Sequence, residues 1–235
     1  LRRVPARDVD ATTAQFRRFG NLFEIVSAEY WRENHGFRQP TPVIEWAQEY
    51  LADPVGRAHL TALAEIRERA SGVQTSLEEA ALDLLGGSHD VVVARRHVID
   101  GAETDDELAS AGTLTPDEHG AYFAFTVRSL AEIQAAQPNA TYVAVFQNWL
   151  RPAGASFDHL HKQLVAIDEQ GPQVDHELRL LASDHALYQH AIADLAVREG
   201  LVVAAIDGAV AFAGVGHRYP AFEVYSTSTA NLPQE

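Results

Sequence analysis

The sequence predicts an α+β fold in which an antiparallel sheet is flanked by helices. Long stretches carry the three-to-four-residue spacing of apolar side chains that is typical of helices, and short apolar segments typical of strands lie between them. Near the C-terminal end, Asp207-Gly208 is a two-residue turn signal that joins antiparallel strands in a hairpin. With 46% hydrophobic residues among 235, the chain can supply the core of such a fold.

The first third of the chain is predicted to be mostly helical. Residues 1–27 have an extended pattern, and residues 30–70 have helical spacing that is interrupted by Asp53-Pro54. A further helix is predicted over residues 76–85, because Glu78 and Glu79 stand near its start and glycines follow its end. We expect these helices to be scaffold.

The middle of the chain combines strands with one strongly marked helix. Thr115 is a good N-cap, Pro116 suits the first helical position and Glu118 completes a capping box, so a helix is predicted from here to about Ala136. Strands are predicted over 89–95, 141–147 and 162–168.

The last part begins after Gly171-Pro172 with a long helix predicted over residues 174–199. Its three histidines are expected to be solvated or packed and to have no catalytic role: His176, His185 and His190. Three strands are predicted to follow, at 201–206, 209–215 and 221–226.

Composition narrows the classes of protein. The formal charge of −15 argues against general affinity for nucleic-acid backbones or anionic membranes, and no apolar run is long enough to span a bilayer. The chain has no cysteine, which excludes disulfides and thiolate ligands within it and favours a cytoplasmic protein. It also has no methionine, so we expect either that the chain is part of a longer protein or that modified methionines are missing from the sequence.

The most informative segment is Asn148 to Gln163, which ends in His-x-His-x-Gln. In a strand, the two-residue period places His159, His161 and Gln163 on one face, opposite Lys162, which we expect to be a solvent-facing or second-layer cation. Imidazole serves as nucleophile, base or metal ligand near neutral pH, and a small-residue turn upstream offers N–H groups to an anion. The spacing alone leaves open a surface feature, a structural metal site and a catalytic site.

The wider string resembles the galactose-1-phosphate uridylyltransferase family, a branch of the histidine-triad-like superfamily. In that family a Phe-x-Asn strand, a Gly-x-Ser turn and His-x-His-x-Gln follow one another, as they do in residues 146–163. The segment around Asn21 is similar to the family's Asn-Leu-Phe segment, and residues 89–97 resemble its His-Glu-Val strand.

This resemblance implies a repeat fold and a division of the chain. Residues 1–172 would form a first histidine-triad-like domain that carries the motif, with a helical insertion at about 28–85. Residues 173–235 would form a connecting helix and the start of a second repeat that is truncated in this chain. The family also implies a homodimer.

The resemblance implies a role for each motif residue. His161 would attack the α-phosphorus of a nucleotide donor and carry the nucleotidyl group as a phosphoramidate. The non-bridging phosphate oxygens would be held by Gln163 and Ser156, together with the N–H groups around Gly154 and Ala155. Two asparagines would bind the nucleotide: Asn21 at the base and Asn148 at the phosphates or ribose.

His97 and His159 match zinc ligands of the family. Because two imidazoles make a weak zinc site, either the remaining ligands lie outside this chain or the metal has been lost and His159 is structural. The leading function is a nucleotidyltransferase or phosphorylase that acts on a nucleoside diphosphate sugar or dinucleoside polyphosphate, with phosphate or a sugar 1-phosphate as acceptor. The alternatives are a nucleotide hydrolase of the same superfamily and a catalytically silent nucleotide-binding protein.

Overall fold

The structure is a computed structural model, and it describes residues 14–21, 26–104, 106–155, 157–206 and 208–226. The contacts divide the chain into two compact units, Leu1–Glu169 and Gln170–Glu235. Each unit is described by itself.

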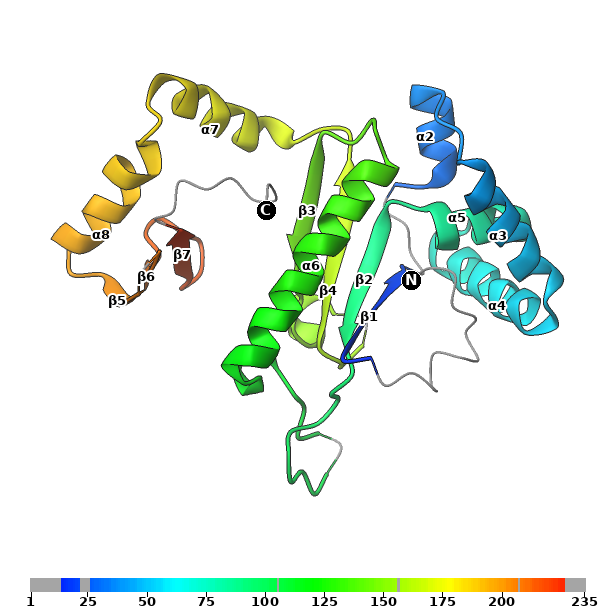
Figure 1. The fold of residues 1–235 in the computed structure, drawn as a ribbon, viewed down its shortest axis with the longest axis horizontal. Coiled ribbons are helices and arrows are strands. Elements are labelled where there is room, and N and C mark those ends of the chain that lie inside the picture. Colours follow the sequence, from blue (N-terminus) through cyan, green and yellow to red (C-terminus); the bar gives the residue numbers. More distant parts are fainter. Residues whose placement is uncertain (1–13, 22–25, 105, 156, 207, 227–235) are drawn as a thin grey trace. The chain divides into compact units, whose positions relative to one another are not determined.

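The centre of the first unit is a four-stranded antiparallel sheet with the order β1-β2-β4-β3 (Figure 1). The strands are β1 (Phe16–Gly20), β2 (His89–Ala94), β3 (Tyr142–Phe146) and β4 (His161–Ile167). The predicted α+β class with an antiparallel sheet and flanking helices is therefore confirmed. The strand that carries the motif begins one residue earlier than the sequence predicts.

One face of this sheet is covered by α6 (Pro116–Ala136), which crosses it in Figure 1. The helix begins where the sequence predicts, because Thr115 and Glu118 form the expected reciprocal capping box. The core between helix and sheet consists of apolar residues from alternate strand positions and from the inner side of the helix: Phe16, Val92, Ala94, Tyr122, Ile133, Leu160, Leu164 and Ala166. The opposite face of the sheet carries the motif residues.

Four helices lie between β1 and β2 in the sequence. They are α2 (Ala28–His35), α3 (Thr41–Ala52), α4 (Pro54–Ser71) and α5 (Leu77–Gly86). Asp53 ends α3 and caps α4, since its side chain accepts hydrogen bonds from the N–H groups of Val55 and Gly56. The last three of these helices, α3, α4 and α5, share a separate apolar core. Arg67 of α4 pairs with buried Asp83 of α5 at 2.9 Å.

The second unit begins with α7 (Gly171–Ser183), followed by the π-helical turn η3 (Gln189–Ala193) and α8 (Asp194–Arg198). Three antiparallel strands follow in the order β5-β6-β7: β5 (Val202–Ile206), β6 (Ala209–Ala213) and β7 (Phe222–Ser226). The predicted hairpin turn passes through Gly208, whose φ is 83°, and Asp207 lies outside the described residues.

The single long helix predicted over residues 174–199 is wrong, because the helix is broken after Ser183. Asp184 adopts an extended conformation with φ −138° and ψ 97°. Its carboxylate accepts a hydrogen bond from the N–H of Ala186 and contacts His190 Nδ1, which offers the backbone an alternative to the helical pattern. The three histidines of this region are exposed.

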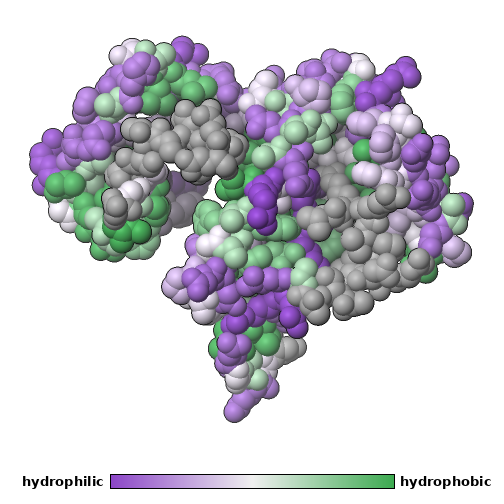
Figure 2. Space-filling model, in the orientation of Figure 1, coloured by the Kyte–Doolittle hydropathy of each residue, from purple (hydrophilic) through white to green (hydrophobic). Residues whose placement is uncertain are grey.

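Hydrophobic side chains are exposed on the three-stranded sheet, where Figure 2 shows them on the visible surface. The most exposed are Val203, Ile206, Phe222 and Val224, of which Ile206 and Phe222 are each 76% exposed. Among the described residues, none of the helices combines the length and the apolar character needed to cross a membrane.

Candidate active site

The two faces of β4 separate the motif as the alternation predicts. His161 lies opposite Val93 of β2, and Gln163 lies opposite Val91 of β2 and Phe146 of β3. Lys162 occupies the intervening position, opposite Val92, which belongs to the core under α6. His161 and Gln163 therefore lie on the face that α6 does not cover.

His161 is held in one orientation by the chain that precedes it. Its Nδ1 lies 2.6 Å from the carbonyl oxygen of His159, which can only accept a hydrogen bond. In the neutral ring, Nδ1 therefore carries the hydrogen and Nε2 carries the lone pair. The residue is 2% exposed, and Nε2 is buried with no hydrogen-bond partner among the described residues.

An aromatic ring covers the imidazole of His161. The Phe157 ring stacks on it at a centroid distance of 4.1 Å and an interplanar angle of 25°, and Phe157 itself is 41% exposed. The Phe157 ring therefore covers one face of the buried imidazole. The position of Phe157 in the turn before the motif gives no periodic signal from which this contact could be predicted.

Gln163 belongs to a polar group of three side chains. Its Oε1 lies 3.0 Å from His89 Nε2 and 3.3 Å from Asn21 Nδ2, and the latter two atoms are 2.8 Å apart. Asn21 follows β1 and His89 begins β2, so three segments that are distant in the sequence meet beside the motif. No role was predicted for His89, although alternation along β2 places it on the same face as Val91 and hence as Gln163.

The side chains of His97 and His159 lie close together. Their Nδ1 atoms are 3.2 Å apart, and His159 Nε2 lies 2.5 Å from the carbonyl oxygen of Ala94. Burial lowers the pKa of His159, and the neighbouring His97 lowers it further. Within the part of the chain that the structure describes, no group of three or more His, Cys, Asp or Glu side chains could hold a metal ion.

The backbone N–H groups of Gly154 and Ala155, which were predicted to bind phosphate, donate hydrogen bonds within the turn before the motif. Gly154 N–H donates to the carbonyl oxygen of Arg151, and Ala155 N–H donates to that of Leu150. Gly154 has a φ of 87°, and a side chain at this position would lie 3.8 Å from Asn148 Nδ2. Asn148 therefore lies beside the turn, and Ser156 lies outside the described residues.

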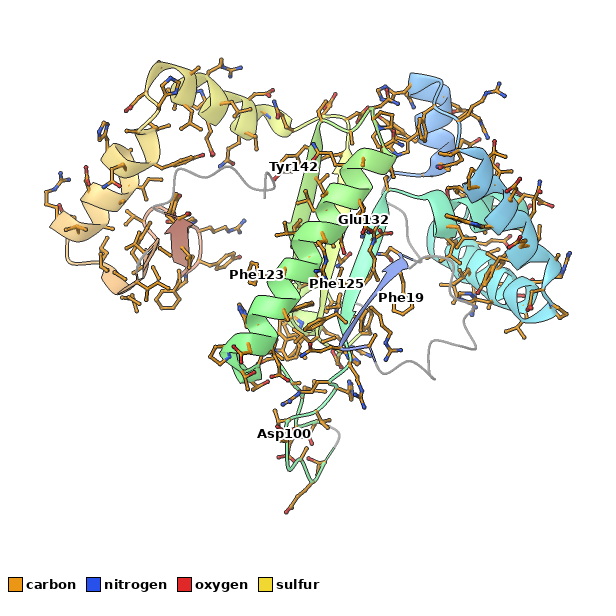
Figure 3. The ribbon with its side chains drawn as sticks, in the orientation of Figure 1. Phe19, Asp100, Phe123, Phe125, Glu132 and Tyr142 are labelled. Atoms are coloured by element: carbon orange, nitrogen blue, oxygen red, sulfur yellow. The ribbon has the colours of Figure 1, made fainter. Side chains whose placement is uncertain are left out.

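Lys162 is buried, which corrects the solvent-facing alternative in the prediction of a solvent or second-layer cation. It is 8% exposed, and its Nζ lies 4.2 Å from the Tyr122 ring centroid and 3.8 Å from that of Phe123, which Figure 3 labels on α6. Nζ has no hydrogen-bond partner among the described residues. Burial lowers the pKa of Lys162 to about 8. Lys162 is buried because α6 covers the face of the sheet opposite His161.

A cavity of about 440 Å³ lies in the helical insertion, between residues of α2, α3 and α5. None of the motif residues lines it. His161 and Gln163 lie instead on the face of the four-stranded sheet that α6 does not cover.

Comparisons with known proteins place the chain in a family. A family described as "Domain of unknown function (DUF4921)" matches residues 1–235, and no curated protein matches. Among solved structures, the chain is similar to a uridylyltransferase, with 21% identity, a TM-score of 0.40, and coverage of 53% of this chain and 38% of that one. It is also similar to an ADP-glucose phosphorylase from Arabidopsis thaliana, with 21% identity, a TM-score of 0.37 and coverage of 53% and 36%.

A third solved structure, a GalT-like protein from Arabidopsis thaliana, is 22% identical with a TM-score of 0.37, and the match covers 52% of this chain and 38% of that one. The chain thus spans little more than a third of the length of these structures. Because the family match extends over residues 1–235, the chain belongs to the DUF4921 family.

Proposed function

We propose that this chain carries the nucleophile of a nucleotidyltransferase or phosphorylase, and that His161 forms a covalent nucleotidyl intermediate. The observation that carries the proposal is the state of the His161 ring. Its Nδ1 is held by a carbonyl at 2.6 Å, and its Nε2 is buried without a partner among the described residues. A nucleophilic imidazole needs this arrangement, with a fixed tautomer and a lone pair on the outer nitrogen.

The reaction consists of two displacements at one phosphorus atom. In the first, the lone pair of His161 Nε2 forms a bond to the α-phosphorus, and the bond from that phosphorus to the bridging oxygen breaks, so that the leaving phosphate takes the electron pair. The positive charge that develops on the ring is stabilised by the Nδ1–H bond to the His159 carbonyl. In the second, an acceptor phosphate oxygen attacks and the lone pair returns to Nε2.

Gln163 is the neighbouring side chain that can stabilise the reacting phosphate. It lies two residues along the same strand face as His161, and its Oε1 is held on the side of His89 and Asn21. The NH₂ group is then available to donate to a non-bridging oxygen as charge redistributes. Donors of the class of nucleoside diphosphate sugars or dinucleoside polyphosphates fit this chemistry, with phosphate or a sugar 1-phosphate as acceptor.

We also propose that zinc is bound through His97 and His159. Two nitrogens that are each about 2.0–2.1 Å from a tetrahedral zinc ion lie about 3.3 Å apart, close to the observed 3.2 Å between the two Nδ1 atoms. The contact of His159 Nε2 with the Ala94 carbonyl is of the kind that orients a ligating imidazole. Zinc held here would order the chain on which His161 depends, and its other ligands would come from outside the described residues.

The test of the covalent mechanism is adduct formation. The protein is incubated with α-labelled nucleoside diphosphate sugars, ADP-glucose among them, and the label retained on protein is measured after acid and base treatment. We expect an acid-labile, base-stable adduct in the wild type and none in His161→Ala, with His176→Ala, an exposed residue of α7, as the matched control. Full labelling of His161→Ala would refute the mechanism.

The same experiment separates the alternatives. A transferase or phosphorylase discharges the adduct quickly with phosphate or a sugar 1-phosphate and slowly in buffer, because water must be excluded while the intermediate waits. Equal discharge in buffer would identify a hydrolase. Nucleotide binding without any adduct would identify a silent binding protein.

A further inference from the structure

The face of the sheet that carries His161 differs in charge from the chain as a whole. The sequence has 33 acidic residues against 18 lysines and arginines. Among the described residues of β1 to β4, the positions that share this face include no carboxylate and only one permanent cation, Arg17. The other positions on this face hold aliphatic, aromatic, imidazole or amide side chains. A phosphate bound on this face would therefore meet a cation and no strand carboxylate.

The strand register places Arg17 in line with His161. Arg17 lies opposite Val93 of β2, and Val93 lies opposite His161 of β4, so the three residues form one row across the sheet. Directly opposite residues of antiparallel strands have their side chains on the same face. Since neighbouring strands are about 4.8 Å apart, the Cα atoms of Arg17 and His161 are separated by about 10 Å. A diphosphate lying across β2 would have one phosphate beside His161 and the other toward Arg17.

The charge of Arg17 acts on the segment that holds His161. Burial is the main cause that lowers the pKa of His159, and the positive charge of Arg17 contributes to the same lowering. The carbonyl oxygen of His159 is the group that lies 2.6 Å from His161 Nδ1. Arg17 also interacts with another group of the chain. A guanidinium has several N–H donors in a planar fork, so it can keep such a contact and still bind phosphate oxygens.

We propose that Arg17 binds the leaving phosphate of the nucleotide donor, which is the second phosphate of a diphosphate whose α-phosphorus is attacked by His161. The inference rests on the proposed function, because it assigns a ligand to the phosphate that departs. When the bond from the α-phosphorus to the bridging oxygen breaks, this phosphate gains negative charge, and the guanidinium stabilises it. The acceptor phosphate of the second displacement occupies the same place, because that step is the reverse of the first.

Variants of Arg17 test its role in forming the adduct. Arg17→Gln removes the charge, and Arg17→Lys keeps the charge but loses the planar fork. Arg69→Gln, which changes an exposed residue of α4, is the matched control. We expect Arg17→Gln to slow adduct formation from ADP-glucose by about 10- to 100-fold, because a hydrogen bond between charged groups contributes that much. Arg17→Lys should slow it less. Adduct formation at the wild-type rate in Arg17→Gln would overturn the proposal.

Discharge of the adduct separates phosphate binding from a purely structural role. In Arg17→Gln, discharge by inorganic phosphate should be slowed, because the acceptor loses its cation. Discharge in buffer should be unchanged, because water carries no charge for Arg17 to bind. A disturbed fold around His161 would change both rates by a similar factor, and that result would contradict the proposal.

Binding of inorganic pyrophosphate does not depend on the covalent step. We expect calorimetry to give Arg17→Gln an affinity at least about 10-fold weaker than that of the wild type, and Arg69→Gln an unchanged affinity. In the wild type, pyrophosphate should shift the NMR resonance of the Arg17 Nε–H group and leave that of Arg69 in place, a measurement that needs no variant to fold. No shift at Arg17 would overturn the proposal. If pyrophosphate shifts Arg17 but no donor forms an adduct, the covalent mechanism fails and the phosphate site stands.

Discussion

Lys162→Met should stabilise the protein at neutral pH. Lys162 is the only lysine in the sequence, and its ammonium group lies under α6 with no hydrogen-bond partner among the described residues. Methionine has a similar length and flexibility and carries no charge, so it should fill the same space between Tyr122 and Phe123. The substitution therefore isolates the free energy of burying one unpaired cation.

The magnitude follows from the pKa. Burial lowers the pKa of Lys162 from 10.5 to about 8, and at about 1.4 kcal/mol per unit this corresponds to roughly 3 kcal/mol. A gain of up to about 3 kcal/mol is therefore expected for Lys162→Met at pH 7, or a rise in Tm of up to about 6–12 °C for a chain of this size.

The pH dependence gives the sharper test. Below pH 8 the lysine is charged in both the folded and the unfolded state, so the full cost is present. Between pH 8 and 10.5 the unfolded state binds more protons than the folded state, and the stability of the wild type rises with pH relative to Lys162→Met. Most of the difference should close by about pH 10.

The assay is urea unfolding of both proteins at pH 7 and pH 10, since groups other than Lys162 titrate equally in the two proteins and cancel. The Nζ resonance of a single lysine needs no assignment, so its titration can be followed directly by NMR. A titration midpoint near 10.5, or a Lys162→Met variant that is less stable than wild type at both pH values, would refute the reasoning.

Two further predictions concern the histidines. Phe157→Ala should uncover the imidazole of His161 and raise its rate of acylation by diethyl pyrocarbonate several-fold. Peptide mapping measures this rate, with exposed His176 as internal reference. An unchanged rate would mean that Phe157 does not shield the ring. His97→Ala should reduce the zinc content and lower the Tm, because it removes one of the two imidazoles proposed to bind the metal. Elemental analysis that finds no zinc in the wild type would contradict the zinc proposal.

Local signals in the sequence were sufficient to predict where several helices begin and which residues of β4 share a face. The capping box at Thr115 and the Asp53-Pro54 pair act within one turn of helix, so their effect does not depend on distant parts of the chain. The two-residue alternation of β4 is equally local, and it correctly separates His161 and Gln163 from Lys162.

What the sequence could not provide is the pairing between segments. The contact of His89 with Gln163 joins residues 74 apart, and that of Asn21 with His89 joins residues 68 apart. Alternation states which side chains share a face of one strand, but it does not state which strand lies next to it or which face a helix covers. For this reason the sequence shows neither that His89 lies beside Gln163 nor that α6 covers Lys162.

The register of β4 connects the core to the site. A slip of one residue would exchange the two faces, so that Lys162 would enter the site and His161 would lie under α6. The same slip would expose Leu160 and Leu164, which are fully buried, and each of them would lose roughly 1.5–3 kcal/mol of burial free energy. The apolar residues on the covered face therefore fix the position of His161 on the opposite face. Burying the charge of Lys162 destabilises this register, but burying Leu160 and Leu164 on either side of it stabilises the same register by more.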